Sequence, residues 1–82
     1  ISALKIDKSF VSDLATNMDD QAIAMAVISL GHKLNLRVIA EGVETEQQCS
    51  FLRDNDCDEM QGYLFSRPVG PADFAAMLAR AA

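Results

Sequence analysis

Three short apolar runs alternate with stretches of helical periodicity, and this alternation constrains the fold more than any other feature. The runs span residues 2–7, 36–41 and 59–64, and each precedes a segment that predicts a helix. Parallel strands need long crossover connections, commonly helices, whereas antiparallel strands can be joined by tight turns. The sequence therefore predicts a βαβαβα chain of the α/β class, with parallel strands and no hairpin. Three consecutive βα units fit a (β/α)8 barrel, although periodicity alone equally allows a flavodoxin-like open sheet.

The first helix is predicted to follow a polar linker that includes Asp13, Thr16 and Asn17. Asp19 or Asp20 is the expected N-cap, and Asn35 is the expected left-handed residue after the helix. The predicted buried stripe consists of Ile23, Ala26, Val27, Leu30 and Leu34.

The two later helices have clearer start signals. Thr45 and Gln48 form a capping box, which predicts a helix from Glu46 to about Asp54. This helix should bury Cys49 and Leu52 and end at a left-handed Asn55. Pro71 should lie in the first turn of the last helix. Its predicted buried stripe is Phe74, Met77, Leu78 and Ala81.

Size and charge restrict the classes of function. With 82 residues the chain forms one small domain at most. A net charge of −5 argues against a binder of nucleic-acid polymers or anionic membranes, because these partners require a basic surface. No apolar run is long enough to cross a membrane in this chain. Two cysteines without metal-site spacing, Cys49 and Cys57, indicate reduced thiols and a cytoplasmic location.

Three polar side chains lie at or near the ends of the predicted strands: Lys5, Glu41 and Gln61. The carboxyl ends of parallel strands meet at one edge of the sheet, where α/β proteins commonly carry their chemistry. Strand alternation places Lys5 on the face opposite to Leu4 and Ile6. We therefore expect the lysine, the carboxylate and the amide to converge.

Each of these residues also has a purely structural explanation. Glu41 can be a solvated glutamate at a strand end, and Lys5 can pair with Asp7 or Glu41. Glu44 can stabilise the start of the next helix through its negative charge. Gln61 can be a hydrogen-bonded strand residue. His32 and the methionines are predicted to be ordinary helix-surface and packing residues.

Three segments together resemble one protein family. They are Leu4-Lys5-Ile6-Asp7, Glu41-Gly42-Val43-Glu44-Thr45 and Gln61-Gly62-Tyr63-Leu64-Phe65-Ser66-Arg67-Pro68. In order and spacing they resemble the C-terminal part of the EAL domain, a bacterial phosphodiesterase that linearises cyclic di-GMP. The Glu-Ala-Leu signature and the Asp-Asp pair of that family are absent from this sequence. The resemblance implies that residues 1–82 are a C-terminal fragment of an EAL domain, the last three β/α units of a TIM-like barrel.

The resemblance also implies roles for the strand-end residues. Glu41 would lie at a two-metal centre, as a ligand of Mg²⁺ or Mn²⁺ or as a general base. Lys5 would position the attacking water and offset charge on the phosphoryl oxygens. Glu44 would brace a neighbouring active-site loop, and Gln61 would lie at the rim of the site near the substrate.

The implied function is metal-dependent hydrolysis of cyclic di-GMP to linear pGpG in bacterial signalling. The implied partners are cyclic di-GMP, the rest of the parent EAL domain, GGDEF or sensory domains, and a second copy in a homo-oligomer. The isolated fragment is expected to be inactive, because the other metal ligands lie outside it. The alternatives are a degenerate EAL module that binds cyclic di-GMP without hydrolysing it, and an unrelated α/β interaction module.

Overall fold

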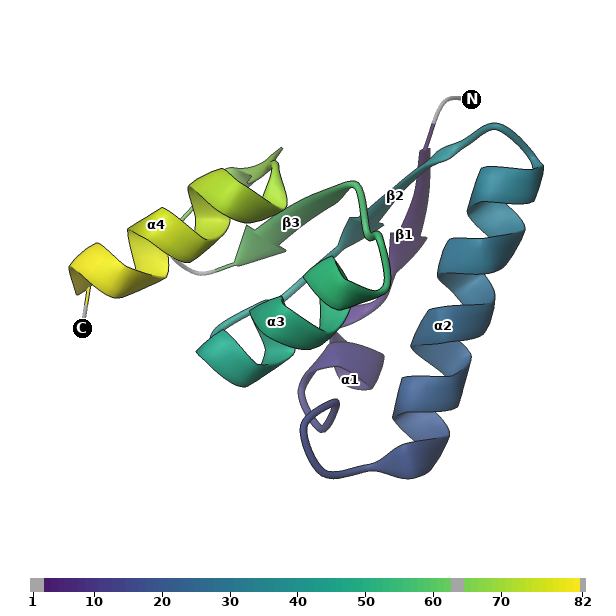
Figure 1. Ribbon diagram of the computed structural model, residues 1–82, viewed down its shortest axis with the longest axis horizontal. Helices are drawn as coiled ribbons and strands as arrows, with labels where there is room; N and C mark the ends of the chain where they lie inside the picture. The colour runs from purple at the N-terminus through teal and green to yellow at the C-terminus, as the bar shows by residue number, and fades with distance from the viewer. Residues whose placement is uncertain (1–2, 63–64, 82) are drawn as a thin grey trace.

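The computed structural model describes residues 3–62 and 65–81. The elements in chain order are β1 (Ala3–Ile6), α1 (Lys8–Val11), α2 (Met18–Lys33), β2 (Arg37–Ala40), α3 (Glu46–Asp54), β3 (Glu59–Gly62), β4 (Phe65–Val69) and α4 (Pro71–Ala81). The strands form one sheet in the order β1-β2-β3-β4 (Figure 1). Spatial order therefore follows chain order.

The sheet is mostly parallel. β1 pairs with β2, and β2 pairs with β3, in parallel register, as the sequence predicts. β3 and β4, however, pair antiparallel with an irregular register, so the prediction of no hairpin is wrong. The sequence between them has no Asn-Gly or Asp-Gly signal, and Pro68 within β4 makes this segment look less like a strand. The predicted third strand ended at Leu64, which lies outside the described residues.

The two faces of the sheet differ in character. Register places Lys5, Ile39 and Glu59 side by side, so these residues share one face. Leu4, Ile6, Val38, Ala40 and Met60 alternate with them and point to the other face. Four of these five residues belong to the main hydrophobic core, whereas Ile39 is buried outside it. One face is therefore apolar and covered, and the other is lined mainly by charged side chains.

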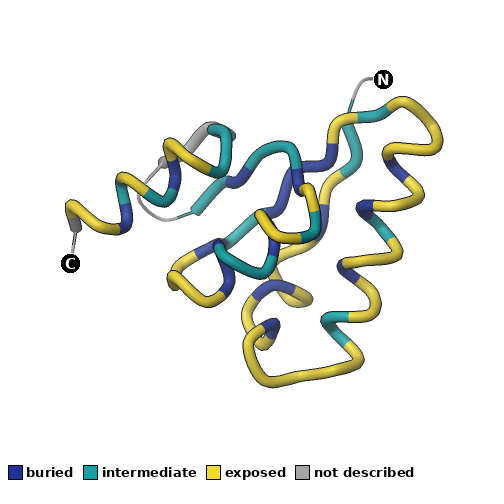
Figure 2. The backbone as a smooth tube through the Cα atoms, in the orientation of Figure 1, coloured by how far each residue is buried: buried dark blue, intermediate teal, exposed yellow. Residues whose placement is uncertain are grey.

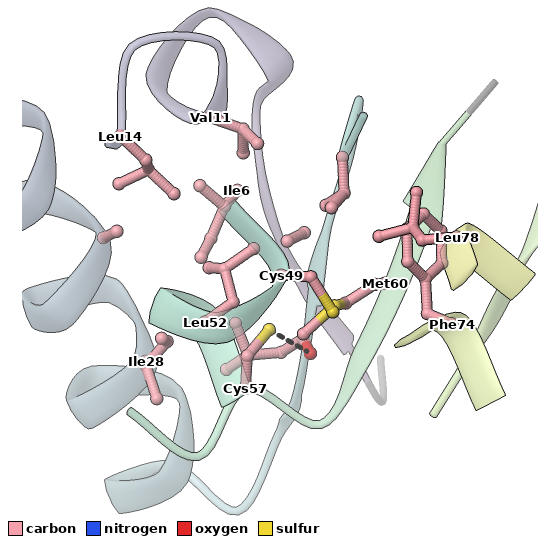
Figure 3. Packing of buried hydrophobic residues seen from close by; sticks show 14 residues of the cluster. Ile6, Val11, Leu14, Ile28, Cys49, Leu52, Cys57, Met60, Phe74 and Leu78 are labelled. Carbon is pink, nitrogen blue, oxygen red and sulfur yellow. Dashed lines mark hydrogen bonds between the residues drawn. The ribbon is translucent and has the colours of Figure 1, made fainter. Parts of the chain in front are cut away.

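The hydrophobic core fills the space between the apolar face and the helices. Ile6, Leu14, Ile28 and Leu52 come from four different segments and converge there, as Figure 3 shows. Phe74 is fully buried and Leu78 is 7% exposed, which confirms two members of the stripe predicted for α4. Met77 is only half-buried.

Helix α2 buries a different face from the predicted one. Its buried residues are Ala24, Ile28 and Gly31, and Figure 2 shows them along the side that faces the sheet. The predicted stripe is largely exposed, with Leu30 at 52% and Leu34 at 58%. A Cβ on Gly31 would lie 2.5 Å from Val38 Cγ2. The helix therefore approaches the sheet closely along small residues, which a search for large apolar side chains overlooks.

The segment predicted as a polar linker contains structure of its own. Asp7 caps α1 by accepting hydrogen bonds from the Ser9 backbone N (3.0 Å) and Ser9 Oγ (2.6 Å). Val11 and Leu14 are fully buried in the core. The segment packs against the core because this contact removes its two apolar residues from water.

Helix α2 begins two or three residues earlier than expected. Asn17 is the N-cap, and its Oδ1 accepts a hydrogen bond from the Asp20 backbone N at 3.0 Å. Asp19 and Asp20 therefore lie in the first turn, where their charges favour the helix dipole, instead of capping it. At the other end Asn35 has a φ of 59°, as predicted.

Helix α3 follows its prediction closely. The capping box of Thr45 and Gln48 is present, the helix spans Glu46–Asp54, and Cys49 and Leu52 are buried. The left-handed residue is Asp56, with a φ of 66°, and not Asn55. The backbone N–H of Cys57 donates to Leu52 O (2.9 Å) and that of Asp56 to Arg53 O (3.0 Å), a Schellman motif that ends one residue later than expected.

Both cysteines are free and buried, as predicted. Burial raises the pKa of the Cys57 thiol to about 11, so this group stays protonated near neutral pH. Its Sγ lies 3.5 Å from the carbonyl oxygen of Val38, within hydrogen-bonding distance (Figure 3). Both thiols therefore have a packing role.

His32 has a partner that its sequence context does not indicate. Its Nε2 lies 2.8 Å from Asp58 Oδ2, and the same oxygen accepts a hydrogen bond from the Val38 backbone N at 2.8 Å. Asp58 thus joins the end of α2 to the start of β2. His32 is exposed on the helix surface, as predicted, but its contact with Asp58 was missed because it spans 26 residues of sequence.

This arrangement predicts unequal effects of two substitutions. Asp58→Ala should lower the free energy of unfolding of a complete EAL domain by about 1–3 kcal/mol, because it leaves the N–H of the buried Val38 without its acceptor. His32→Ala should cost less, because Asp58 can still accept from Val38. Urea denaturation of both variants measures the difference. Equal losses would show that the backbone bond contributes little.

Candidate functional site

Lys5 and Glu41 meet at the carboxyl edge of the sheet. Lys5 lies in β1, and Glu41 immediately follows the neighbouring strand β2. The distance between Lys5 Nζ and Glu41 Oε2 is 3.5 Å, and the side chains are 57% and 32% exposed. The exposed setting makes this ion pair a weak source of stability. Its ammonium and carboxylate groups are therefore accessible to a ligand.

The backbone holds the segment after β2 against both neighbouring strands. The Glu41 N–H donates to Ile6 O at 3.0 Å, and the Val43 N–H donates to Gln61 O at 3.0 Å. Val43 is itself fully buried. The loop carrying Glu41 is thus fixed between the ends of β1 and β3.

Gly42 is required at the centre of this loop. Its φ is +74°, and a Cβ at this position would lie 2.5 Å from Lys8 Cβ. An L side chain would therefore meet both backbone strain and a steric clash.

We expect Gly42→Ala to destabilise a complete EAL domain by about 1–3 kcal/mol and to displace Glu41. Thermal denaturation measures the loss. Gly70→Ala is the matched control, because a Cβ at Gly70 has no atom within 4 Å. Equal stability of the two variants would contradict this account of the loop.

A pocket of about 360 Å³ lies beside the ion pair. It is lined by Asp7, Lys8, Glu41, Gly42, Gln61 and Gly62. Two predicted site residues, Glu41 and Gln61, therefore border the same pocket. Lys8 contributes a second cation that the sequence interpretation missed. The sequence did offer a signal for Lys8, because it directly follows Asp7 at the end of the predicted first strand.

Asp7 has a local structural role at the pocket. The hydrogen bonds from the Ser9 side chain and backbone lower the pKa of its carboxyl group. The carboxylate therefore stays ionised while it caps α1. No ion pair between Asp7 and Lys5 occurs within the described residues; the lysine pairs with Glu41.

Glu44 does not line this pocket. It is exposed, whereas its backbone N–H donates to Gln48 Oε1 at 2.7 Å. It lies just before the N-cap Thr45, where a negative charge favours the helix start.

A second ion pair lies on the same face of the sheet and joins β2 to β3. Arg37 Nη1 lies 2.9 Å from Glu59 Oε1, at the amino ends of β2 and β3. Neither residue lines the pocket beside Glu41, so Glu59 offers a matched acidic residue outside the candidate site.

The donor set at the pocket suits a hard divalent cation. Carboxylate and amide oxygens are the ligands that Mg²⁺ and Mn²⁺ prefer. Within residues 3–62 and 65–81, however, no group of three or more histidine, cysteine, aspartate or glutamate residues could hold a metal ion. The described part of the chain can thus supply only a share of a metal site.

The chain belongs to the EAL domain family. The family model described as "EAL domain" matches residues 1–68. The cyclic di-GMP phosphodiesterase NbdA of Pseudomonas aeruginosa is 54% identical over 69 residues, which are 84% of this chain and 9% of NbdA. The bifunctional diguanylate cyclase/cyclic di-GMP phosphodiesterase MucR of the same species is 46% identical over 78 residues, 95% of this chain and 11% of MucR.

Solved structures agree with this assignment. The PaMucR phosphodiesterase in complex with c-di-GMP has a TM-score of 0.74 at 46% identity, over 89% of this chain and 30% of that one. The EAL domain of Mycobacterium smegmatis DcpA has a TM-score of 0.74 at 40% identity, over 98% of this chain and 36% of that one. The predicted family and α/β class are confirmed. The chain spans about a tenth of the length of the curated relatives described above.

In the described part of the chain, no helix is long and apolar enough to cross a membrane.

Proposed function

We propose that this chain is the C-terminal part of an EAL domain that hydrolyses cyclic di-GMP to linear pGpG in bacterial signalling. The observation that carries the proposal is the Lys5–Glu41 pair beside a pocket bordered by Gln61. Relatives named as cyclic di-GMP phosphodiesterases share about half of the aligned residues. The remaining metal ligands come from the rest of the parent domain.

The reaction is an in-line displacement at phosphorus. The oxygen of a water molecule forms a bond to phosphorus, the bond from phosphorus to the ribose 3′ oxygen breaks, and that oxygen takes up a proton. Mg²⁺ or Mn²⁺ at the site would polarise the phosphoryl oxygens and lower the pKa of the attacking water. Glu41 is the residue of this chain that would hold the cation or accept the proton.

The cations around the pocket support binding of an anionic ligand. Lys5 Nζ, 3.5 Å from Glu41, can orient the water and offset the charge that develops on the phosphoryl oxygens. Lys8 lines the pocket and adds positive charge to an otherwise acidic chain. Gln61 offers an amide at the rim of the site, and Glu44 would brace a neighbouring active-site loop.

The test is incubation of a complete EAL domain containing this chain with cyclic di-GMP and either Mg²⁺ or Mn²⁺. Chromatography should show pGpG accumulating, and a chelator should stop its formation. Binding of cyclic di-GMP without product would instead indicate a degenerate receptor.

A further inference from the structure

Gln48 is a buried polar side chain whose hydrogen bonds extend beyond its own helix. It is 6% exposed. Its Oε1 accepts from the backbone N of Glu44 at 2.7 Å and of Thr45 at 3.1 Å. Its Nε2 donates to the carbonyl oxygen of Ser12 at 3.2 Å. The bonds to the Glu44 amide and to the Ser12 carbonyl are not part of a capping box.

The bond to Ser12 joins two segments that are 36 residues apart in sequence. One segment follows β1, begins at Asp7 and carries Lys8, which lines the pocket. The other follows β2 and carries Glu41. Gln48 thus connects the two loops that leave the sheet at the edge where Lys5 and Glu41 meet.

An amide satisfies all the partners of this position, whereas an ionised carboxylate does not. Two backbone N–H donors require an acceptor on one side, and the Ser12 carbonyl requires a donor on the other. An ionised glutamate would keep the two accepted bonds and place a second acceptor against the carbonyl. Since the site is buried, that mismatch cannot be relieved by water without moving one of the loops.

We propose that Gln48 is a positioning residue for catalysis, which holds the Glu41 loop in register with the loop after β1. The proposal rests on the proposed phosphodiesterase function. It assigns to Gln48 a role separate from its contribution to the start of α3. Small displacements of a catalytic group are sufficient to slow a reaction strongly, so the role is measurable.

Two variants of a complete EAL domain separate the roles. Gln48→Glu keeps both acceptor bonds to the Glu44 and Thr45 amides and loses the donation to Ser12. Thr45→Ala is the matched control, because it removes the other half of the capping box and leaves every side-chain bond of Gln48. Both should lower the thermal midpoint by a few degrees.

Kinetics with cyclic di-GMP then decide the question. For Gln48→Glu, kcat should fall by roughly 10- to 100-fold, since the catalytic loop is displaced, while KM stays within roughly twofold. Thr45→Ala should keep kcat within roughly twofold of the wild type. Equal losses of kcat in both variants, or a wild-type kcat in Gln48→Glu, would overturn the proposal.

The turnover of the wild type separates this inference from the proposed function. Wild-type protein without turnover would refute the phosphodiesterase function, and with it any catalytic role for Gln48. An active wild type with indistinguishable variants would refute the positioning role alone.

Hydrogen–deuterium exchange should rise across residues 8–17 in Gln48→Glu and stay unchanged in Thr45→Ala. Unchanged exchange in both would exclude the link between the loops.

Discussion

Replacing Glu41 with Gln in a complete EAL domain is expected to lower turnover of cyclic di-GMP by roughly 10²–10⁴-fold. The amide preserves the shape of the side chain but carries no charge. It can neither hold a divalent cation as a carboxylate does nor accept a proton from water. It also removes the ionic partner of Lys5, 3.5 Å away. Steady-state assays of pGpG formation measure the effect.

Glu59→Gln is the matched control for this substitution. Glu59 lies on the same face of the sheet and also pairs with a cation, Arg37, but neither residue lines the pocket beside Glu41. Turnover in this variant should stay within a few-fold of the wild type. Near-normal turnover of Glu41→Gln, or an equal loss in Glu59→Gln, would mean that Glu41 has only a structural role.

The isolated 82 residues are expected neither to hydrolyse cyclic di-GMP nor to remain monomeric. Hydrolysis should be undetectable, because the described residues contain no cluster of potential metal-ligating side chains. Association should follow from the open edge of β1, which can pair with another chain. Helix α2 also exposes Ile23, Leu30 and Leu34 along one side. These residues form an apolar surface that favours contact with a second copy.

Light scattering beside an assay with Mn²⁺ tests this expectation on the purified chain. Replacing Leu30 and Leu34 with Gln should reduce the apparent mass, because both side chains are more than half exposed and lie one turn apart. Met18→Gln is the control, since Met18 is 81% exposed at the first position of the helix. A stable monomer with measurable turnover would show that the chain forms a complete site by itself.

Local signals predicted the parts of the fold that depend on neighbouring residues. The capping box of Thr45 and Gln48 placed the start of α3 correctly, and Pro71 placed the start of α4. Strand alternation put Lys5 on the face opposite to Ile6, and the Lys5–Glu41 contact was one of the alternatives considered. The helix starts and the strand alternation follow from short-range geometry, whereas the Lys5–Glu41 contact follows from the parallel pairing of β1 with β2.

Features that depend on distant contacts were predicted poorly. The buried face of α2 follows the close approach of Gly31 to Val38, so Ile23, Leu30 and Leu34 are left exposed. His32 meets Asp58 only because the chain folds back over 26 residues. Gln48 was expected to cap its helix, but its bond to Ser12 has no local signature. Tertiary packing determines each of these contacts.

The most direct measurement is a crystal structure of a complete EAL domain containing this chain, with Mn²⁺ and cyclic di-GMP, and with anomalous scattering from the metal. The account predicts an anomalous peak for a manganese ion that the Glu41 carboxylate coordinates, with a phosphate oxygen of cyclic di-GMP close by. Lys5 should point toward the same phosphate. A metal held elsewhere, with Glu41 bound only to Lys5, would contradict the assignment of this sheet edge as part of the catalytic centre.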